Sequence, residues 1–498
     1  MTGYARTFLT QFEQVAVACA ERGIKIVVNA RGLMPQLAEL RRAGVPFAHL
    51  DTGRSLQDAD VQPVSANAYL GGWGIAAALS SGADIVVTGR VTDAALVVCV
   101  GSCWHGWARR DHDALAGAVA AGHIIECGPQ ATGGNYAQLH EIRDRRYPGS
   151  PIAELACDGS FVITKPANTG GLVSSGTVIA QLLYEVGSPR YLNPDVVAHF
   201  DTLAVTQEGP DRVRISGTKG SPPPSTLKAA MSYVGGYRML TGLDIEEKAA
   251  WAVDGLFALL GGRDQNGEVD VHLLRYDTPD PTSMPEATAH LTVTVEDRDR
   301  AAVDRGFFNA VVELDVAGYP GFHSTTPPSS ANESGVYWPT LVPSHFVEHV
   351  VVHADGSREA NPHSTSATEP TAAIPQPTYA DPVIDAGPTT RRPLGTVVAA
   401  RSGDKGGNAK LGVWTDTDER WVWLRNHPTA DRFRELVGDG GDLPIQRYEF
   451  GNLKALNFVV TGFLGDGVAS CTRPDPQAKA LGEYLRSMHT DIPDRLLG

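Results

Sequence analysis

The stretch "ARSGDKGGNAKLGVW", residues 400–414, sets basic side chains beside glycines and then continues as a largely apolar strand. Its polar loop residues are Arg401, Asp404, Lys405 and Asn408. Its loop glycines are Gly403, Gly406 and Gly407. Glycine adopts backbone conformations that other residues avoid, so successive N–H groups can converge on one anion while the cations add charge. The stretch therefore predicts a phosphate or carboxylate cradle, and a hairpin turn with solvated charges is the alternative.

Strands and helices alternate around this stretch. The predicted strands span residues 394–401, 409–415, 420–425, 445–450 and 456–464. The predicted helices span residues 430–438 and 476–489. Two helices over a mainly antiparallel sheet predict a ferredoxin-like α+β domain, which we place at residues 394–498.

A segment rich in Pro, Ser, Thr and Ala precedes this domain. Residues 354–393 show almost no apolar periodicity, which is typical of a linker. The remaining residues, 1–353, form the other predicted unit. From about residue 200 onward this unit alternates apolar and polar positions around one helix, so we expect an α+β extension built against the first sheet.

The N-terminal part of that unit alternates between strands and helices. The predicted strands span residues 24–30, 46–50 and 83–89, the last one apolar and buried. The predicted helices span residues 6–22, 31–44 and 65–82. This order predicts an α/β core with a parallel sheet, in which ligands bind beyond the carboxyl ends of the strands.

Polar residues follow the strand predicted at 83–89. Arg90, Thr92 and Asp93 occupy the position where such a sheet exposes its ligand crevice. An arginine at a strand end needs a partner or a ligand, so Arg90 is a predicted binding residue and Asp93 a candidate for proton transfer. Capping of the following helix is the alternative role for Thr92 and Asp93.

Two further carboxylates and several loops complete the candidate site. Glu126 ends an apolar stretch, where burial would raise its pKa and suit it to act as a general base. The candidate catalytic residues are Asp93, Glu126 and Asp404. Backbone amides and small residues before a helix bind anions, although they also serve as simple helix caps. The candidate binding residues are Arg90, Lys165, Asn168, Gly170, Gly171, Lys219, Arg401, Lys405, Gly406, Gly407 and Asn408.

The composition excludes several classes of protein. The 498 residues include 57 Asp and Glu against 42 Lys and Arg, which argues against non-specific nucleic-acid binding. The six cysteines are scattered without a second pair at zinc spacing, so we expect no metal and no disulfide scaffold. Neither a signal peptide nor a membrane span is predicted, and a cytoplasmic location is expected. Because Trp73 and Trp104 lie in apolar surroundings, we also expect a homo-oligomer.

The chain resembles the acyclic terpene utilisation AtuA family. The resemblance rests on "ADIVVTGRVTDAAL", "HIIECGPQATGGNYA", "ITKPANTGGLVSSGTV" and "ARSGDKGGNAKLGVW" in this order, and it covers nearly the whole chain. It implies a core through about residue 350, an AtuA-like ferredoxin-fold domain after it, and the breakdown of acyclic isoprenoids as coenzyme A thioesters beside a geranyl-CoA carboxylase. Members of the family usually begin one βα unit earlier, with a Gly-rich first strand, so we expect either a misassigned start or the loss of this N-terminal βα unit.

Two functions follow from these features. The first is an enzyme that acts on a branched acyl-CoA or carboxylate by hydratase, dehydratase or lyase chemistry, which needs acid–base groups and no redox cofactor. Coenzyme A is then expected only as part of the substrate. The alternative is a non-catalytic acyl-CoA-binding or scaffold subunit that partners a biotin-dependent acyl-CoA carboxylase. A dehydrogenase has less support, because no GxGxxG fingerprint follows a predicted strand.

Overall fold

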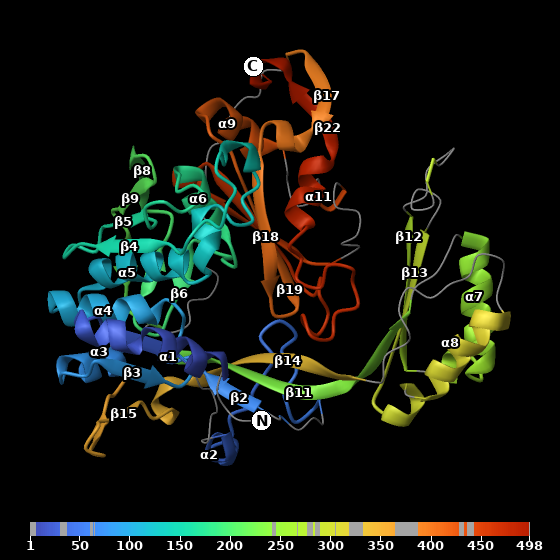
Figure 1. Cartoon of the computed structure of the whole chain (residues 1–498), viewed down its shortest axis with the longest axis horizontal. Coiled ribbons are helices and arrows are strands. Elements are labelled where there is room, and N and C mark those ends of the chain that lie inside the picture. Colours follow the sequence, from blue (N-terminus) through green and yellow to red (C-terminus); the bar gives the residue numbers. More distant parts are fainter. Residues whose placement is uncertain are drawn as a thin grey trace.

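The computed structural model describes residues 6–29, 37–59, 63, 65–241, 246–265, 267–275, 282–283, 289–303, 305–317, 332–363, 387–427, 433–435 and 443–497. Three bodies are visible (Figure 1): a mixed core, a C-terminal domain packed against it, and a lobe carried away from both by a long ribbon of two strands. The expected fold class, mixed α and β with a C-terminal α+β domain, is confirmed.

The parallel pairing predicted for the N-terminal part is present in one pair of strands. Helix α1 (Arg6–Glu21) leads into β1 (Ile26–Asn29), α2 (Leu37–Arg42) follows, and β1 pairs in parallel with β3 (Ile85–Thr88). Strand β3 is less buried than its apolar sequence predicts, because Ile85 and Val87 are about half exposed. Within the described ranges, all other strand-to-strand ladders are antiparallel, and the sheets are small.

Two local predictions in this part are wrong. Residues 46–50 do not form a strand, because Phe47 adopts a positive φ and its carbonyl oxygen accepts a hydrogen bond from the indole of Trp338 at 2.9 Å. Residues 65–82 are not one helix: β2 (Ser65–Ala68) pairs with a distant strand, and α3 begins only at Trp73. The chain turns between them, where the Gly72 amide donates to the Asp195 carboxylate at 2.8 Å.

Small residues allow the core helices to pack closely. Helices α3 (Trp73–Ser80), α4 (Ala95–His105) and α5 (His112–Ile125) lie side by side (Figure 1), and α5 is buried along nearly its whole length. A Cβ atom at Gly122 would lie 2.7 Å from the backbone of Ala94, so only glycine permits this approach. The antiparallel sheet beside them contains β4 (Ile152–Leu155), β5 (Phe161–Thr164), β9 (Arg212–Ser216) and β8 (Ala204–Gly209).

A capped helix and a small sheet complete the core. Ser174 and Thr177 form a capping box at the start of α6 (Ser175–Leu183), in which each side chain accepts a hydrogen bond from the other residue's amide. The small sheet contains β6 (Arg190–Leu192), β7 (Val197–His199) and β10 (Lys219–Ser221).

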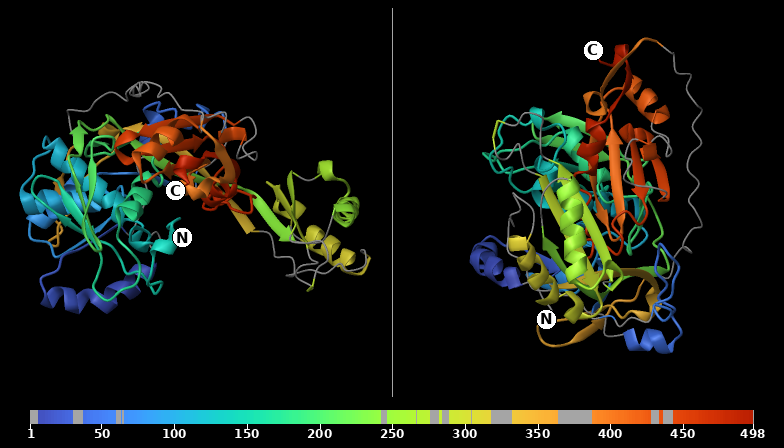
Figure 2. Two further views of the ribbon diagram at one scale, coloured as in Figure 1. Left: turned by 90° about the horizontal axis from the view of Figure 1, so that it is seen from above. Right: turned by 90° about the vertical axis from the view of Figure 1, so that its right-hand side faces the viewer.

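The ribbon consists of β11 (Thr226–Thr241) and β14 (Asn332–Pro343), paired antiparallel with a bulge between Val234 and Gly236. At its far end lies the lobe, which contains α7 (Glu246–Leu259), β12 (Glu268–Arg275), β13 (Ala289–Asp297) and α8 (Arg305–Ala317). The lobe has a hydrophobic cluster of its own, which includes Leu256, Phe257 and Phe307. Figure 2 shows the lobe standing apart from the rest of the molecule.

The segment predicted as a linker, residues 354–393, is described only at its two ends. Strand β15 (Val350–Val352) forms a hairpin with β16 (Arg358–Ala360), and β17 (Thr389–Pro393) pairs with the last strand of the chain, β22 (His489–Pro493). Residues 364–386 lie outside the described residues.

The C-terminal domain is an antiparallel sheet covered by helices. Its strands follow the order β18 (Ala399–Lys405), β19 (Asn408–Trp414), β21 (Ala455–Val460) and β20 (Ile445–Phe450), and α11 (Leu481–Ser487) packs on β18 and β19. Residues 420–425, predicted as a strand, belong instead to α9 (Asp418–Asn426). The Thr417 side chain caps this helix, and only Trp423 and Leu424 of it are buried. The helix predicted at 430–438 lies mostly outside the described residues.

No helix among the described residues is long and apolar enough to cross a membrane. Of the two tryptophans used to predict a homo-oligomer, Trp104 is 83 % exposed, whereas Trp73 lies under the guanidinium group of Arg109. The homo-oligomer stays a prediction.

Candidate functional site

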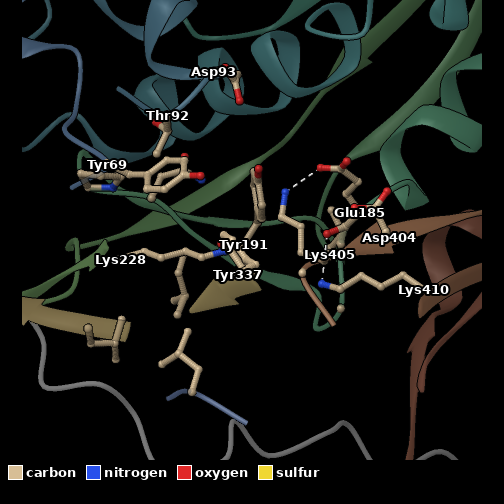
Figure 3. A pocket seen from close by; sticks show the side chains of 18 of the residues that line it. Tyr69, Thr92, Asp93, Glu185, Tyr191, Lys228, Tyr337, Asp404, Lys405 and Lys410 are labelled. Atoms are coloured by element: carbon tan, nitrogen blue, oxygen red, sulfur yellow. Dashed lines mark hydrogen bonds and ion pairs between the residues drawn. The ribbon is translucent and has the colours of Figure 1, made fainter. Parts of the chain in front are cut away.

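A cavity of about 810 Å³ lies where the core, the base of the ribbon and the C-terminal domain meet. The core contributes residues from the β3–α4 corner and the α6–β6 loop, the ribbon contributes β11 and β14, and the C-terminal domain contributes the β18–β19 hairpin. The polar side chains that line it include Tyr69, Arg90, Thr92, Asp93, Glu126, Glu185, Arg190, Tyr191, Lys228, Tyr337, Asp404, Lys405 and Lys410. Figure 3 shows how ten of these cavity residues lie.

The stretch quoted first is a hairpin whose tip borders this cavity. Strands β18 and β19 are paired through Lys405 and Asn408, so Gly406 and Gly407 form the turn. Gly406 has a φ of +66°, and a Cβ atom there would lie 2.7 Å from the Tyr337 ring. The stretch therefore forms a hairpin at the edge of a cavity, but its charges are paired or buried instead of solvated. The anion cradle stays a prediction.

The pairing register explains which hairpin side chains reach the cavity. Paired residues of an antiparallel ladder share a face of the sheet, so Lys405 lies on the same face as Lys410, the partner of Gly403. Arg401 lies on this face as well but farther from the tip, and it does not line the cavity. Its guanidinium group covers the Tyr184 ring at 4.3 Å and donates a hydrogen bond to Gln130.

Lys405 is held by an acidic partner. Its Nζ atom lies 2.6 Å from the Glu185 carboxylate. Burial lowers the pKa of Lys405, but the attraction and hydrogen bond of Glu185, together with Tyr191 and Glu126, outweigh burial, so the pKa is raised overall. Glu185 itself has a lowered pKa, because Lys405 outweighs the opposing effect of burial. This pair is charged across the ordinary pH range.

Lys410 and Lys228 lack such a partner. The Lys410 ammonium group donates to the backbone oxygen of Glu185 at 3.1 Å, and burial, Lys405 and Lys228 together lower its pKa to about 7. The Lys228 Nζ atom lies near the rings of Tyr69 and Tyr337, at 5.7 and 5.8 Å from their centres. Burial lowers the pKa of Lys228, and Lys405 lowers it further. Among the described residues, neither lysine forms an ion pair with a carboxylate.

The β3–α4 corner and the hairpin both line the cavity, and Figure 3 shows Thr92 and Asp93 facing the hairpin lysines. The Arg90 guanidinium group lies 4.6 Å from the centre of the Tyr69 ring and 3.6 Å from the Asp93 carboxylate. Asp93 also accepts a hydrogen bond from Asn29 at 3.2 Å. The hydroxyl group of Thr92 is buried and has no hydrogen-bond partner in the described part of the chain.

Glu126 and Asp404 complete the acidic side of the cavity. Glu126 follows the last residue of α5, and its carboxylate lies 3.4 Å from the His123 ring. Burial raises the pKa of Asp404, and the Glu185 carboxylate raises it further. Of the predicted residues, the cavity thus brings together Arg90, Asp93, Glu126, Asp404, Lys405 and Gly406.

The other predicted residues lie away from the cavity and have structural partners. Lys165 pairs with Asp211 at 3.3 Å, and Lys219 pairs with Asp113 at 2.8 Å. Asn408 donates to Asp51 at 3.0 Å and accepts from the Gly462 amide at 2.8 Å. Asn168 has a positive φ in a tight loop. The glycines Gly170, Gly171 and Gly407 each fit against neighbouring backbone.

Several cavity residues were not among the site residues predicted from the sequence. Lys410 belongs to the quoted stretch, and Lys228 interrupts the apolar run of β11, so a lysine within each strand was the available signal. Glu185, Tyr69, Tyr191 and Tyr337 carry no local signal. They reach the cavity only through contacts between segments far apart in the sequence.

Within the described ranges, no group of three His, Cys, Asp or Glu residues is arranged to hold a metal ion. Two family models match the chain. The model for the acyclic terpene utilisation family protein AtuA matches residues 32–353, and the model for the AtuA ferredoxin-like domain matches residues 392–491. Searches of curated proteins and of solved structures gave no match.

Proposed function

Because the chain belongs to the acyclic terpene utilisation family AtuA, we propose that it is an enzyme of acyclic isoprenoid catabolism. Its substrate would be a branched acyl-CoA or the related carboxylate, bound in the cavity between the core and the C-terminal domain. The reaction would be a hydration, a dehydration or a lyase step, driven by acid–base groups.

The observation that carries this proposal is the position of Lys228. Its ammonium group lies in the cavity, on a half-buried side chain and without a carboxylate partner among the described residues, although a charge withdrawn from water is costly unless it is paired. A carboxylate or phosphate of a substrate would supply the missing partner. Arg90, which also lies near the Tyr69 ring, adds a second cation to the same region.

The remaining walls suit the rest of such a substrate. Apolar side chains border the cavity beside the cations: Leu50, Leu192, Leu341 and Val468. They would hold a branched hydrocarbon chain. Asp404 has a raised pKa and would donate a proton, whereas Asp93 and Glu126, which also line the cavity, would accept one. These acid and base roles are part of the proposal.

The test is a binding and turnover assay with a panel of isoprenoid acyl-CoAs and their free acids. Mass spectrometry would follow the gain or loss of water or carbon dioxide. Tight binding with unchanged ligands would instead support a non-catalytic acyl-CoA-binding subunit, and a carboxylase partner would then be sought by co-purification. Absence of both binding and turnover would contradict the proposal.

Lys228→Met is the variant that tests the anion site. We expect it to weaken ligand binding by about tenfold or more, because a charge-assisted hydrogen bond is lost. The same change should raise the melting temperature of the ligand-free protein, because it removes a half-buried charge without a carboxylate partner. The matched control is Lys219→Met, outside the cavity, which should leave ligand affinity unchanged. Unaltered affinity in the Lys228 variant would refute this role.

A further inference from the structure

Lys410 lies on the face of the β18–β19 hairpin that it shares with Lys405, and the positions around it are tightly packed. Gly403, its partner across the ladder, lies against the Tyr184 ring, and Gly412, two residues along the strand, lies against Leu183. A Cβ atom at Gly187 would be only 3.6 Å from the Lys410 Nζ atom. The amine is therefore placed at the α6–β6 loop, where it borders the cavity (Figure 3).

The neighbours of this amine favour its uncharged form. The carboxylate of Glu185 is already occupied by Lys405, and the hydrogen bond of the Lys410 amine within the described part of the chain goes to the backbone oxygen of the same residue. The charged groups that act on it are Lys405, Lys228, Glu185 and Asp51. In Figure 3, Lys228 and Lys410 approach the centre of the cavity from opposite sides. Burial and the two cations outweigh the two carboxylates, so the pKa of the amine is lowered and its neutral form is favoured.

We propose that Lys410 is an amine nucleophile that forms an imine with the carbonyl group of an oxo acid, whose carboxylate lies on Lys228. Desolvation and a neighbouring cation are the known means by which proteins activate a lysine amine toward carbonyl compounds. An ordinary lysine is almost entirely protonated at neutral pH. This inference names the substrate class of the proposed function, and it rests on that function only for the anion site at Lys228.

The chemistry needs no further reactant. The nitrogen lone pair attacks the carbonyl carbon, the new C–N bond forms, and the carbonyl oxygen takes up a proton. Loss of this oxygen as water leaves a protonated imine. This cation then accepts the electron pair of the bond between the α and β carbons and becomes an enamine. The β fragment leaves as an aldehyde or ketone as its hydroxyl group gives up a proton to a carboxylate of the cavity, which is the step that a lyase requires. Protonation of the enamine carbon and hydrolysis of the imine release the product and restore the amine.

The experiment uses the full-length protein with levulinate, a small oxo acid, in the presence of cyanoborohydride. The hydride reduces the imine to a stable secondary amine, which peptide mass spectrometry assigns to one lysine. We expect the adduct at Lys410 in the unsubstituted protein, formed far faster than at the exposed Lys25, and its loss in Lys410→Arg and Lys410→Met. Because the assignment is made in the unsubstituted protein, it does not depend on how the variants fold. No adduct, or an adduct at Lys228 or Lys405 instead, would overturn the proposal.

A second probe separates the amine from the anion site. Methyl propyl ketone has the same carbonyl group but no carboxylate. In Lys228→Met, trapping of levulinate should fall by about tenfold relative to trapping of this ketone, because only levulinate loses a charge-assisted hydrogen bond. An equal change for both probes would refute the pairing of the carboxylate with Lys228. Trapping without any turnover of isoprenoid acyl-CoAs would uphold the imine and contradict the proposed function, and the opposite pair of results would do the reverse.

Discussion

At the scale of single residues, the burial of Asp195 makes the stability of the fold depend on pH. Its carboxylate is 3 % exposed and accepts a hydrogen bond from the Gly72 amide at 2.8 Å. Burial raises the pKa of Asp195 to about 6, against the opposing effects of that hydrogen bond and of Arg109. A carboxyl group whose pKa is raised by folding stabilises the fold below pH 3.8, its ordinary pKa, and this contribution is lost as the pH rises through about 6.

Asp195→Asn should remove that dependence. The free energy of unfolding of the variant, minus that of the unsubstituted protein, should rise by at most about 3 kcal/mol as the pH increases from below 3.8 to above 6. Urea unfolding at pH values across this range is the measurement. Any constant cost of the new amide group cancels in the comparison, and Asp84→Asn at an exposed position controls for the loss of a carboxyl group. A difference that does not vary with pH would contradict the assignment.

At the scale of elements, the contact between the β18–β19 hairpin and the end of α6 joins the two domains. It depends on glycine, because a Cβ atom at Gly412 would lie 2.6 Å from the Cβ atom of Leu183, which is itself fully buried. The side chain of Asn457 on the next strand donates a hydrogen bond to the backbone oxygen of Val186, which fixes the loop that carries Glu185. The hairpin and the loop therefore position each other.

Gly412→Ala should force these two elements apart. We expect a loss of about 1–3 kcal/mol in the free energy of unfolding, the usual cost of overpacking a core. Chemical denaturation would measure it. Gly306→Ala provides the control, because a Cβ atom at Gly306 meets nothing within 4 Å and should cause no loss. Equal stability of both variants would show that the contact is not tightly packed.

The elements that could be predicted from the sequence are those that local pattern determines. Strands β18 and β19 follow from apolar runs on either side of a glycine turn, and α1 follows from its helical spacing. Residues 46–50 were wrongly predicted as a strand because their conformation depends on a hydrogen bond from Trp338, which is 291 residues away from Phe47. The composition of the cavity likewise depends on contacts between segments far apart in the sequence. The corner at Arg90 and the hairpin at Lys405 were both predicted to bind anions, but Lys228 and Glu185 belong to other segments, and no local pattern brings them there.

At the scale of the whole molecule, the lobe is the part least connected to the cavity. Its cluster of buried side chains is separate, and all residues that line the cavity lie within 50–232 or 335–469. The contacts between the ribbon or C-terminal domain and the lobe include the hydrogen bonds of Ser334 to Glu296 and of Thr472 to Asp270. The lobe at the end of the ribbon therefore contributes no residue to the walls of the cavity.

Removing the lobe should leave the cavity in place. Arg238 and Asn332 are paired across the ribbon, so residues 239–331 can be replaced by Asn-Gly, the preferred two-residue turn between antiparallel strands. We expect a folded protein that retains the Lys410 adduct with levulinate. Circular dichroism, thermal unfolding and the trapping assay would measure this. An unfolded product would show that the lobe is needed for the stability of the remainder.

The cavity walls come from two domains, and this has a consequence for any ligand that fills it. A molecule that contacts Lys228 on the ribbon and Lys410 on the hairpin would tie the domains together, so part of its affinity would resist their separation. Ligand binding and separation of the domains are then linked equilibria, and by reciprocity any change that favours separation of the domains also weakens the affinity for the ligand.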